Sequence, residues 1–336
     1  MEHSRRDSLL MKMLQVNNVA TLLGGTGQCA LSIRHALPDF EHRVHFFGMG
    51  DVDKSIQGEF GEQVGIHIGT KIRQEDLEWA DIVIFHNTTM VCMPSRIPEN
   101  CATVYYQHSN HKSARFSADQ CDIGLTVSNI LKRESEFHGH VLYQPVKRPK
   151  RYEFSRHCGT GLAEVAMFCT PNPDKWNRAP ELFSKAFSEF GGSCFFSFIG
   201  APSHIESRLQ ELAGVYGVNA SFTSPSTALR SCLHAWDILL YHSDVVETYG
   251  RTVCEAQMCG CVPVVDNKGG FTEQIRHGYD GFLCNSIPEF MTAIDDVIYD
   301  WQRGFEMSQK AMISGSERGS LVNWRNKFLS ILKGSK

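Results

Sequence analysis

Short apolar runs alternate with helix-like segments along most of the 336-residue chain. Strands of a parallel sheet are usually buried on both faces, so they read as continuous apolar runs, and crossover helices connect them. The runs lie at residues 12–16, 41–47, 81–86, 103–107, 122–127, 163–169, 194–200 and 237–243. This alternation predicts an α/β fold built on parallel sheets.

Two series of such runs are separated by a basic, proline-containing segment at residues 147–151, which has the composition of a linker. We therefore expect one Rossmann-like domain at residues 1–150 and a second at 151–315. A last helix is predicted within residues 316–336. Its apolar residues recur at helical spacing, as in Trp324 and Phe328, and indicate a face that packs into a core.

Two glycine-rich segments lie in the first half. Residues 51–70 read as a loop. Gly24, Gly25 and Gly27 follow the first strand, but their spacing differs from the dinucleotide-binding pattern Gly-x-Gly-x-x-Gly. They indicate either a tight strand-to-helix turn or a backbone loop that contacts a phosphate or an acceptor.

Polar residues follow three strands of the first half, at His86-Asn87, His108-Ser109 and Ser128-Asn129. In an open parallel sheet, ligands bind beyond the carboxyl ends of the strands. A single histidine at a strand end is usually structural, whereas three polar strand ends on one edge favour a site. His108 is our first candidate for a functional histidine, and His86 is the second.

The second half contains two carboxylates, Glu247 and Glu255, with seven residues between them. Gly250 and Arg251 lie at the expected start of a helix that includes Glu255. A helix start offers unpaired N–H groups and a positive dipole end, which suit a phosphate, and carboxylates suit sugar hydroxyls. The alternative without a ligand is a solvated helix start, because glutamate in the first turn of a helix is favourable in itself.

This stretch resembles the Glu-x7-Glu motif of retaining glycosyltransferases with the GT-B fold, and is most similar to glycosyltransferase family four. The match covers residues 237–284. Beyond the two glutamates it continues through Gly260, Pro263, Val264-Val265, Gly269-Gly270, Glu273, Gly278 and Gly281-Phe282. A bare pair of glutamates would be common by chance, but the ordered string would not.

The resemblance implies two Rossmann-like domains whose parallel sheets face a central cleft, with the C-terminal helix crossing back to the first domain. It also implies transfer of a hexose from a nucleotide-sugar, most plausibly UDP-glucose, to an acceptor hydroxyl with retention of configuration and without a metal. In this reading Glu255 binds the ribose, and Glu247 binds the sugar. The N–H groups of Gly250, Arg251 and Thr252 meet the diphosphate.

Further roles follow from the same resemblance. Lys175 and Arg178 would neutralise the leaving diphosphate, although the family's arginine position, near Asn172, is not matched. His108 would hold the sugar. The remaining expected donor contacts are Thr223 and Ser224 to the base, and the loop with Gly25 and Gly27.

Charge and cysteine content bound the partners and the compartment. The formal net charge of -4 gives no strong attraction to nucleic acid or anionic membranes. The 12 cysteines lack Cys-x2-Cys pairs and are typical of reduced, buried thiols. No apolar run approaches the ~20 residues of a membrane span, and the N-terminus has no apolar signal core. We expect a cytoplasmic protein.

Other functions stay open at this stage. The chain could be a nucleotide-sugar epimerase or a phosphorylase-like enzyme on the same architecture, or a non-catalytic binding protein. The acceptor could be a glycan, a lipid-linked glycan or a modified nucleic acid. A DNA-modifying glycosyltransferase acting on hydroxylated bases would use the basic segment at residues 147–151, and peripheral contact with a membrane is also compatible.

Overall fold

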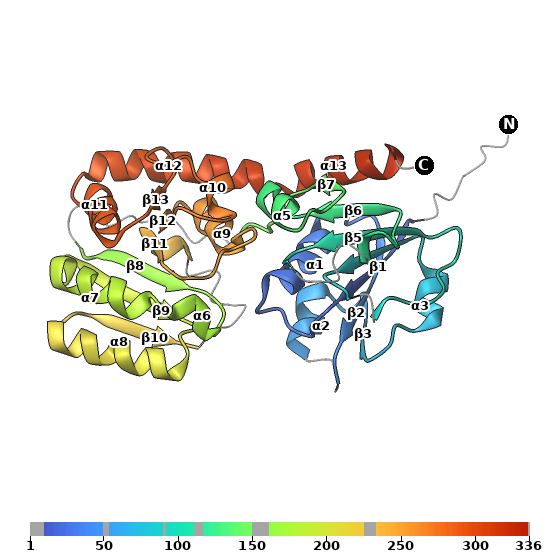
Figure 1. The fold of residues 1–336 in the computed structure, drawn as a ribbon, viewed down its shortest axis with the longest axis horizontal. Helices are drawn as coiled ribbons and strands as arrows, with labels where there is room; N and C mark the ends of the chain where they lie inside the picture. The colour runs from blue at the N-terminus through green and yellow to red at the C-terminus, as the bar shows by residue number, and fades with distance from the viewer. Residues whose placement is uncertain are drawn as a thin grey trace. The chain divides into compact units, whose positions relative to one another are not determined.

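The computed structural model describes residues 10–49, 54–89, 92–110, 117–149, 161–224 and 233–334, and it divides into two compact units (Figure 1). The first unit contains the described residues up to Val127, Leu131–Leu142 and the chain from Trp324 onward. The second unit contains Ser128–Ile130 and Tyr143–Asn323. Each unit is an α/β structure around its own parallel sheet, as the alternating pattern predicts.

The described part of the first unit has a seven-stranded sheet with the strand order β3-β2-β1-β4-β5-β6-β7. All the paired strands run parallel. The strands are β1 (Lys12–Asn17), β2 (Glu41–Phe47), β3 (Gly65–Gly69), β4 (Ile82–His86), β5 (Ala102–Gln107), β6 (Ile123–Thr126) and β7 (His140–Val141). The helices in this part of the chain are α1 (Gly25–Ala36), α2 (Lys54–Phe60), α3 (Gln74–Trp79) and α5 (Asn129–Glu134), of which α5 begins with two residues of the second unit. This order is that of a doubly wound, Rossmann-like sheet.

The described part of the second unit has a six-stranded parallel sheet with the order β10-β9-β8-β11-β12-β13. Its strands are β8 (Ala163–Phe168), β9 (Cys194–Ile199), β10 (Ala220–Thr223), β11 (Ile238–Tyr241), β12 (Val262–Asp266) and β13 (Phe282–Cys284). Its helices are α6 (Pro173–Trp176), α7 (Ala179–Phe190), α8 (Ser203–Tyr216), α9 (Arg251–Met258), α10 (Phe271–Gln274), α11 (Ile287–Ile298) and α12 (Trp301–Arg318).

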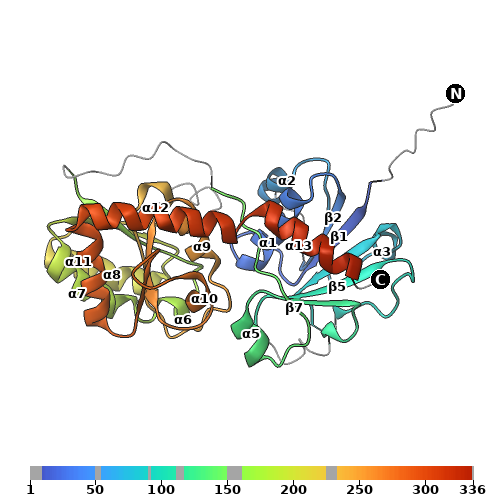
Figure 2. The same cartoon turned by 90° about the horizontal axis from the view of Figure 1, so that it is seen from above.

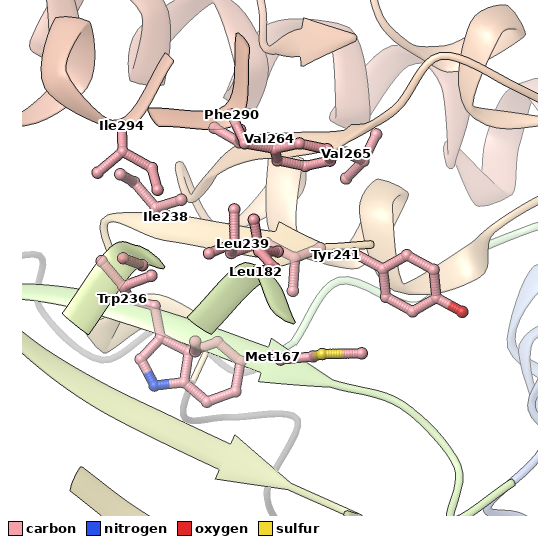
Figure 3. Packing of buried hydrophobic residues seen from close by; sticks show 14 of the residues in the cluster. Met167, Leu182, Trp236, Ile238, Leu239, Tyr241, Val264, Val265, Phe290 and Ile294 are labelled. Carbon is pink, nitrogen blue, oxygen red and sulfur yellow. The ribbon is translucent and has the colours of Figure 1, made fainter. Parts of the chain in front are cut away.

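One apolar core holds the second sheet and its helices together (Figure 3). Leu239 and Val264 come from the central strands, and Phe290 and Ile294 from α11 pack against them. Tyr241 ends β11, and its hydroxyl points away from the labelled apolar side chains. The core therefore fixes the carboxyl end of β11, where the candidate site begins.

The prediction of a loop at residues 51–70 is wrong for the described part of that segment. Residues 54–60 form α2, and residues 65–69 form β3, which pairs in parallel with β2. The glycines reduce intrinsic strand propensity, but β3 lies at the edge of the sheet and gains its hydrogen bonds from β2. Tertiary pairing thus outweighs local composition here.

The C-terminal boundaries also differ from the expected ones. Residues 316–336 do not form one helix, because α12 ends at Arg318 and α13 (Leu321–Gly334) starts after Gly319. The second unit begins at Tyr143 rather than 151 and extends to Asn323. Helix α13 is the last, red helix of the chain in Figure 2. Within the first unit, its Trp324 and Phe328 stack with ring centroids 4.7 Å apart, and Arg325 donates to the backbone oxygen of Ala36 at the end of α1.

Among the described helices, none is both long and apolar enough to cross a membrane.

Candidate active site

Two glycines hold the loop between β11 and α9 in place. The N–H of Gly270 donates to the backbone oxygen of Glu247 at 2.6 Å. A Cβ on Gly269 would lie 2.5 Å from that same oxygen, and one on Gly270 would lie 2.7 Å from the backbone oxygen of Thr248. Only residues without a Cβ allow the turn after β12 to pack this closely on the loop. The Gly-Gly pair of the motif therefore positions the backbone of Glu247.

The Glu247 carboxylate binds two side chains from other segments. Lys175 Nζ lies 2.5 Å from Glu247 Oε1, and the Tyr241 hydroxyl donates to the same oxygen at 3.0 Å. The lysine side chain is 24% exposed and that of the glutamate 17%, so the ion pair is only partly screened by water. The structure thus brings Lys175, a candidate residue, to Glu247, and it adds Tyr241 as a contact that the sequence did not reveal.

Lys175 owes its position to its neighbours in α6. The fully buried Trp176 donates its indole N–H to the backbone oxygen of Thr170 at 3.1 Å. The side chain of Asn172 caps α6 by accepting a hydrogen bond from the Asp174 N–H at 3.0 Å. These two hydrogen bonds hold the short helix after β8, and so they fix the backbone position of Lys175.

Arg178 has a different partner. Its Nε donates to Asp244 Oδ1 at 2.8 Å, and both side chains are about half exposed to solvent. The Asp244 carboxylate raises the pKa of Arg178, and the hydrogen bond from the guanidinium lowers the pKa of Asp244. Arg178 and Lys175 are thus each paired with a carboxylate of the loop that joins β11 to α9.

Gly250 caps α9 in the left-handed conformation, with φ of 79°. A Cβ at this position would lie 2.4 Å from Phe271 Cε1, so the glycine is required by conformation and by space. Thr252 is half-buried in the first turn. The expectation that the N–H groups of Gly250, Arg251 and Thr252 meet a diphosphate stays a prediction.

The side chains of Arg251 and Glu255 turn inward rather than toward solvent. Arg251 Nε donates to Glu255 Oε1 at 2.8 Å, and Arg251 Nη1 donates to the backbone oxygen of Pro145 at 2.8 Å. The Glu255 side chain is only 2% exposed. The alternative of a solvated helix start does not hold for these two side chains. A ribose bound to Glu255 would share the carboxylate with Arg251, and the ribose role stays a prediction.

Glu273, also part of the motif, holds a further segment of the second unit. Its carboxylate accepts hydrogen bonds from the N–H groups of Asn129 and Ile130 at 3.0 and 2.7 Å, and from the Tyr143 hydroxyl at 3.0 Å. The Tyr143 ring stacks on Tyr249, two residues after Glu247, with centroids 6.0 Å apart. Glu273 therefore acts structurally, next to the loop.

The expected base contacts lie at the edge of the described structure. Thr223 ends β10 and accepts a hydrogen bond from the Gly200 N–H on its backbone oxygen at 3.0 Å. Thr223 and Ser224 are both exposed. Residues 225–232, which follow them, lie outside the described residues, so the base site stays a prediction.

In the first unit, two strand ends form one buried polar network. His86 Nδ1 lies 2.9 Å from His108 Nε2, and the Asn87 side chain donates to the Ser109 hydroxyl at 2.7 Å. Burial lowers the pKa of His86 to about 3. His108 is 5% exposed, so its proposed sugar contact would require access to a largely buried ring. Ser128 and Asn129, the third predicted polar strand end, belong to the second unit.

The glycines at the start of α1 have distinct roles. A Cβ on Gly27 would lie 2.1 Å from the backbone oxygen of Thr21, which demonstrates the tight turn. A Cβ on Gly25 would meet no atom within 4 Å. Steric need thus explains Gly27 but not Gly25, whose ligand contact stays a prediction.

Comparison with known proteins agrees with this architecture. HepE of Anabaena, crystallised in complex with UDP-glucose, superposes with a TM-score of 0.76 at 17% identity over 96% of this chain and 100% of HepE. A mutant of S. aureus TarM in complex with UDP, alpha-GlcNAc-glycerol and Fondaparinux superposes with a TM-score of 0.75 at 11% identity, covering 96% and 99% of the two chains. The chain has the GT-B fold. At these identities the likeness concerns the fold alone.

Sequence matches lie in the second unit of this GT-B chain. Residues 175–313 match the family model described as Glycosyl transferases group 1. The GDP-Man:Man(3)GlcNAc(2)-PP-Dol alpha-1,2-mannosyltransferase of Dictyostelium discoideum is 34% identical over 93 residues, which are 27% of this chain and 18% of that relative. The predicted resemblance to GT-B glycosyltransferases is confirmed by the family match over residues 175–313, while the Glu-x7-Glu motif and retention of configuration stay predictions.

Proposed function

We propose that the protein is a glycosyltransferase that moves a hexose from a nucleotide-sugar to an acceptor hydroxyl. One observation carries the proposal: Glu247, with Lys175 2.5 Å away, lies at the carboxyl edge of the second sheet, just before the glycine-capped α9. Ligands of open parallel sheets bind at this edge. A sugar-binding carboxylate beside a phosphate-binding cation and a helix start suits a nucleotide-sugar.

The chemistry assigned to these residues follows from the charges. Breaking the glycosidic bond leaves negative charge on a nucleoside diphosphate. Lys175 and Arg178 would offset this charge after exchanging their carboxylate partners for phosphate oxygens. Glu247 would then be released from Lys175 to accept hydrogen bonds from sugar hydroxyls, while Tyr241 keeps its orientation through the bond to Oε1.

The second half of the donor is assigned to the neighbouring groups. The N–H groups of Gly250, Arg251 and Thr252 would bind the diphosphate, Glu255 the ribose, and Thr223 and Ser224 the base. His108 and the loop with Gly25 and Gly27 keep their proposed contacts with the sugar and the phosphate. The anomeric configuration would be retained. Lys175 and Arg178 would supply the positive charge, so the transfer would need no metal.

UDP-glucose is the first candidate donor, supported by the HepE complex with that nucleotide-sugar. GDP-mannose is the second, because the curated relative is a GDP-mannose-dependent enzyme that uses a lipid-linked acceptor. A glycan or lipid-linked glycan hydroxyl is therefore the proposed acceptor class.

The test is a hydrolysis and transfer screen of the full chain against a panel of nucleotide-sugars, with and without added Mg²⁺. We expect one donor to be turned over, Glu247→Gln and Lys175→Met to abolish turnover, and added Mg²⁺ to have no effect. Lys185→Met is the matched control, because Lys185 also pairs with a glutamate, at 2.6 Å, but on the exposed surface of α7. Absence of binding and turnover for every donor would refute the function.

A further inference from the structure

Three side chains that commonly bind transition metals lie together in the first unit. They are Cys29 in α1, His86 at the end of β4 and His108 just after β5. The cysteine sulfur and one ring nitrogen of each histidine all lie within 4.8 Å of one another, and the three residues are buried. They are far apart in the sequence, so their spacing gives no motif.

The sheet register explains why these groups meet. Asn17 of β1 is opposite His86, and His86 is opposite Tyr106 of β5. Paired residues of parallel strands share a face, and side chains two residues apart share it too, so His108 follows Tyr106 on the same side. Gln15 of β1 donates to the backbone oxygen of Ala30 at 3.0 Å, which identifies this side as the one that α1 covers. Cys29 precedes Ala30 in that helix.

The hydrogen bonds of Gln15 determine the tautomer of His86. Because its side-chain nitrogen donates to Ala30, its oxygen Oε1 faces His86 Nε2 at 3.1 Å. An amide oxygen only accepts, so His86 Nε2 carries the proton and Nδ1 holds the lone pair. That lone pair points at His108 Nε2, 2.9 Å away. A hydrogen-bonded partner on the distal nitrogen is the usual arrangement around metal-bound histidines.

We propose that Cys29, His86 and His108 form a binding site for Zn²⁺, with water as the fourth ligand. One thiolate and two imidazoles are the donor types that zinc prefers. Asn17 lies beside His86, and among the described residues neither polar atom of its buried side chain has a hydrogen-bond partner. It is therefore available to bond the water ligand.

The ligand atoms, which lie within 4.8 Å of one another, would have to move on binding. In a tetrahedral zinc site the ligand atoms are about 3.3–3.5 Å apart, from zinc–nitrogen and zinc–sulfur bonds of about 2.0 and 2.3 Å. The two histidine nitrogens, 2.9 Å apart, would separate slightly. On binding, the Cys29 thiol loses its proton to solvent, and the proton on His108 Nε2 moves to Nδ1.

The test uses the full chain, freed of metal by chelation, and Co²⁺ as the spectroscopic substitute for Zn²⁺. We expect a thiolate-to-cobalt charge-transfer band that saturates at one ion per chain and is lost when Zn²⁺ displaces Co²⁺. In Cys29→Ser the band should disappear. The affinity for Co²⁺ should fall by about 100-fold or more, because loss of a direct ligand should cost at least as much as loss of an outer-shell hydrogen-bond partner. Cys194→Ser, which alters a buried cysteine of β9 in the second unit, should keep both.

Two results would overturn the site. Absence of the charge-transfer band in the wild-type chain would do so without any variant, and therefore does not depend on how the variants fold. Persistence of the band in Cys29→Ser would show that cobalt binds another thiol. The site does not rest on the proposed glycosyl transfer, since the titration contains only the chain and the metal.

Discussion

Replacement of Gly270 by alanine should displace the loop that carries Glu247. Gly270 has φ of −59°, which any residue adopts, so alanine would add no backbone strain. Its Cβ would, however, lie 2.7 Å from three backbone atoms, namely the oxygen of Thr248 and the Cα and oxygen of Tyr249. Backbone atoms cannot rotate away as a flexible side chain can, so the loop or the turn must move.

The size of the effect follows from that geometry. Ordinary contact begins at 3.4 Å, so the two segments must separate by 3.4 minus 2.7, or 0.7 Å. Forcing an extra methyl group into a packed position costs about 1–3 kcal/mol. For a unit of this size, that lowers the Tm by about 2–12 °C. The separation also stretches the 2.6 Å bond between the Gly270 N–H and the Glu247 oxygen.

The assay combines thermal unfolding with UDP titration by calorimetry. We expect Gly270→Ala to bind UDP about fivefold more weakly, the equivalent of about 1 kcal/mol. Gly214→Ala is the matched control, because Gly214 is exposed within α8 and its Cβ would meet no atom within 4 Å. It should raise stability by up to about 1 kcal/mol, since alanine is the better helix former. Unchanged stability and UDP affinity in Gly270→Ala would refute the reasoning.

Three further predictions concern other parts of the chain. Acid should destabilise the first unit, because burial lowers the pKa of His42 and His45 from 6.5 to about 4. Below pH 6.5 the unfolded chain binds protons that the folded unit does not, so the free energy of unfolding should fall by about 1 kcal/mol per histidine for each pH unit. A stability that calorimetry finds unchanged from pH 7 to 5 would contradict this. Asp244→Asn should remove the nearer carboxylate partner of Arg178, which keeps Glu181 at 3.4 Å, and should tighten UDP binding by up to about fivefold at unchanged Tm. Weaker binding in the titration would count against it. Phe328→Ala should lower the free energy of unfolding of the first unit by about 3–5 kcal/mol, because the ring is fully buried. An unchanged midpoint of urea denaturation would contradict this.

The strands of both sheets were largely predictable, because each buried parallel strand is a continuous apolar run. Residues 41–47, for example, are both the predicted and the observed bounds of β2. The edge strand β3 could not be found this way, since its burial is only partial and its hydrogen bonds come from β2. The break between α12 and α13 was missed for a related reason. The apolar stripe continues across it, while Gly319 packs against Val146 and Cys254, which only the folded chain brings near.

The candidate site was predictable where its residues share one local motif. Glu247 and Gly250 stand where the motif places them, at the loop before α9 and at the helix cap. Tyr241 was missed because it reads as the last apolar residue of a strand, and only the folded loop turns the Glu247 carboxylate back onto its hydroxyl. The pairing of Arg178 with Asp244 spans 66 residues of sequence and has no local signal.

The two glutamates of the motif differ in a way that spacing cannot reveal. They stand at the two ends of one seven-residue interval, but the Glu247 side chain is 17% exposed and that of Glu255 is 2% exposed. Leaving a buried carboxylate without its cation costs about 3–5 kcal/mol, because the charge remains in a poor solvent. Glu255 therefore cannot exchange Arg251 for a neutral hydroxyl alone and must bind a ligand while the pair stays intact. Glu247 can exchange Lys175 for sugar hydroxyls, because the same ligand brings a diphosphate that replaces the carboxylate as the partner of the lysine. The donor would thus separate Lys175 from Glu247 and would bind against the intact pair of Arg251 and Glu255.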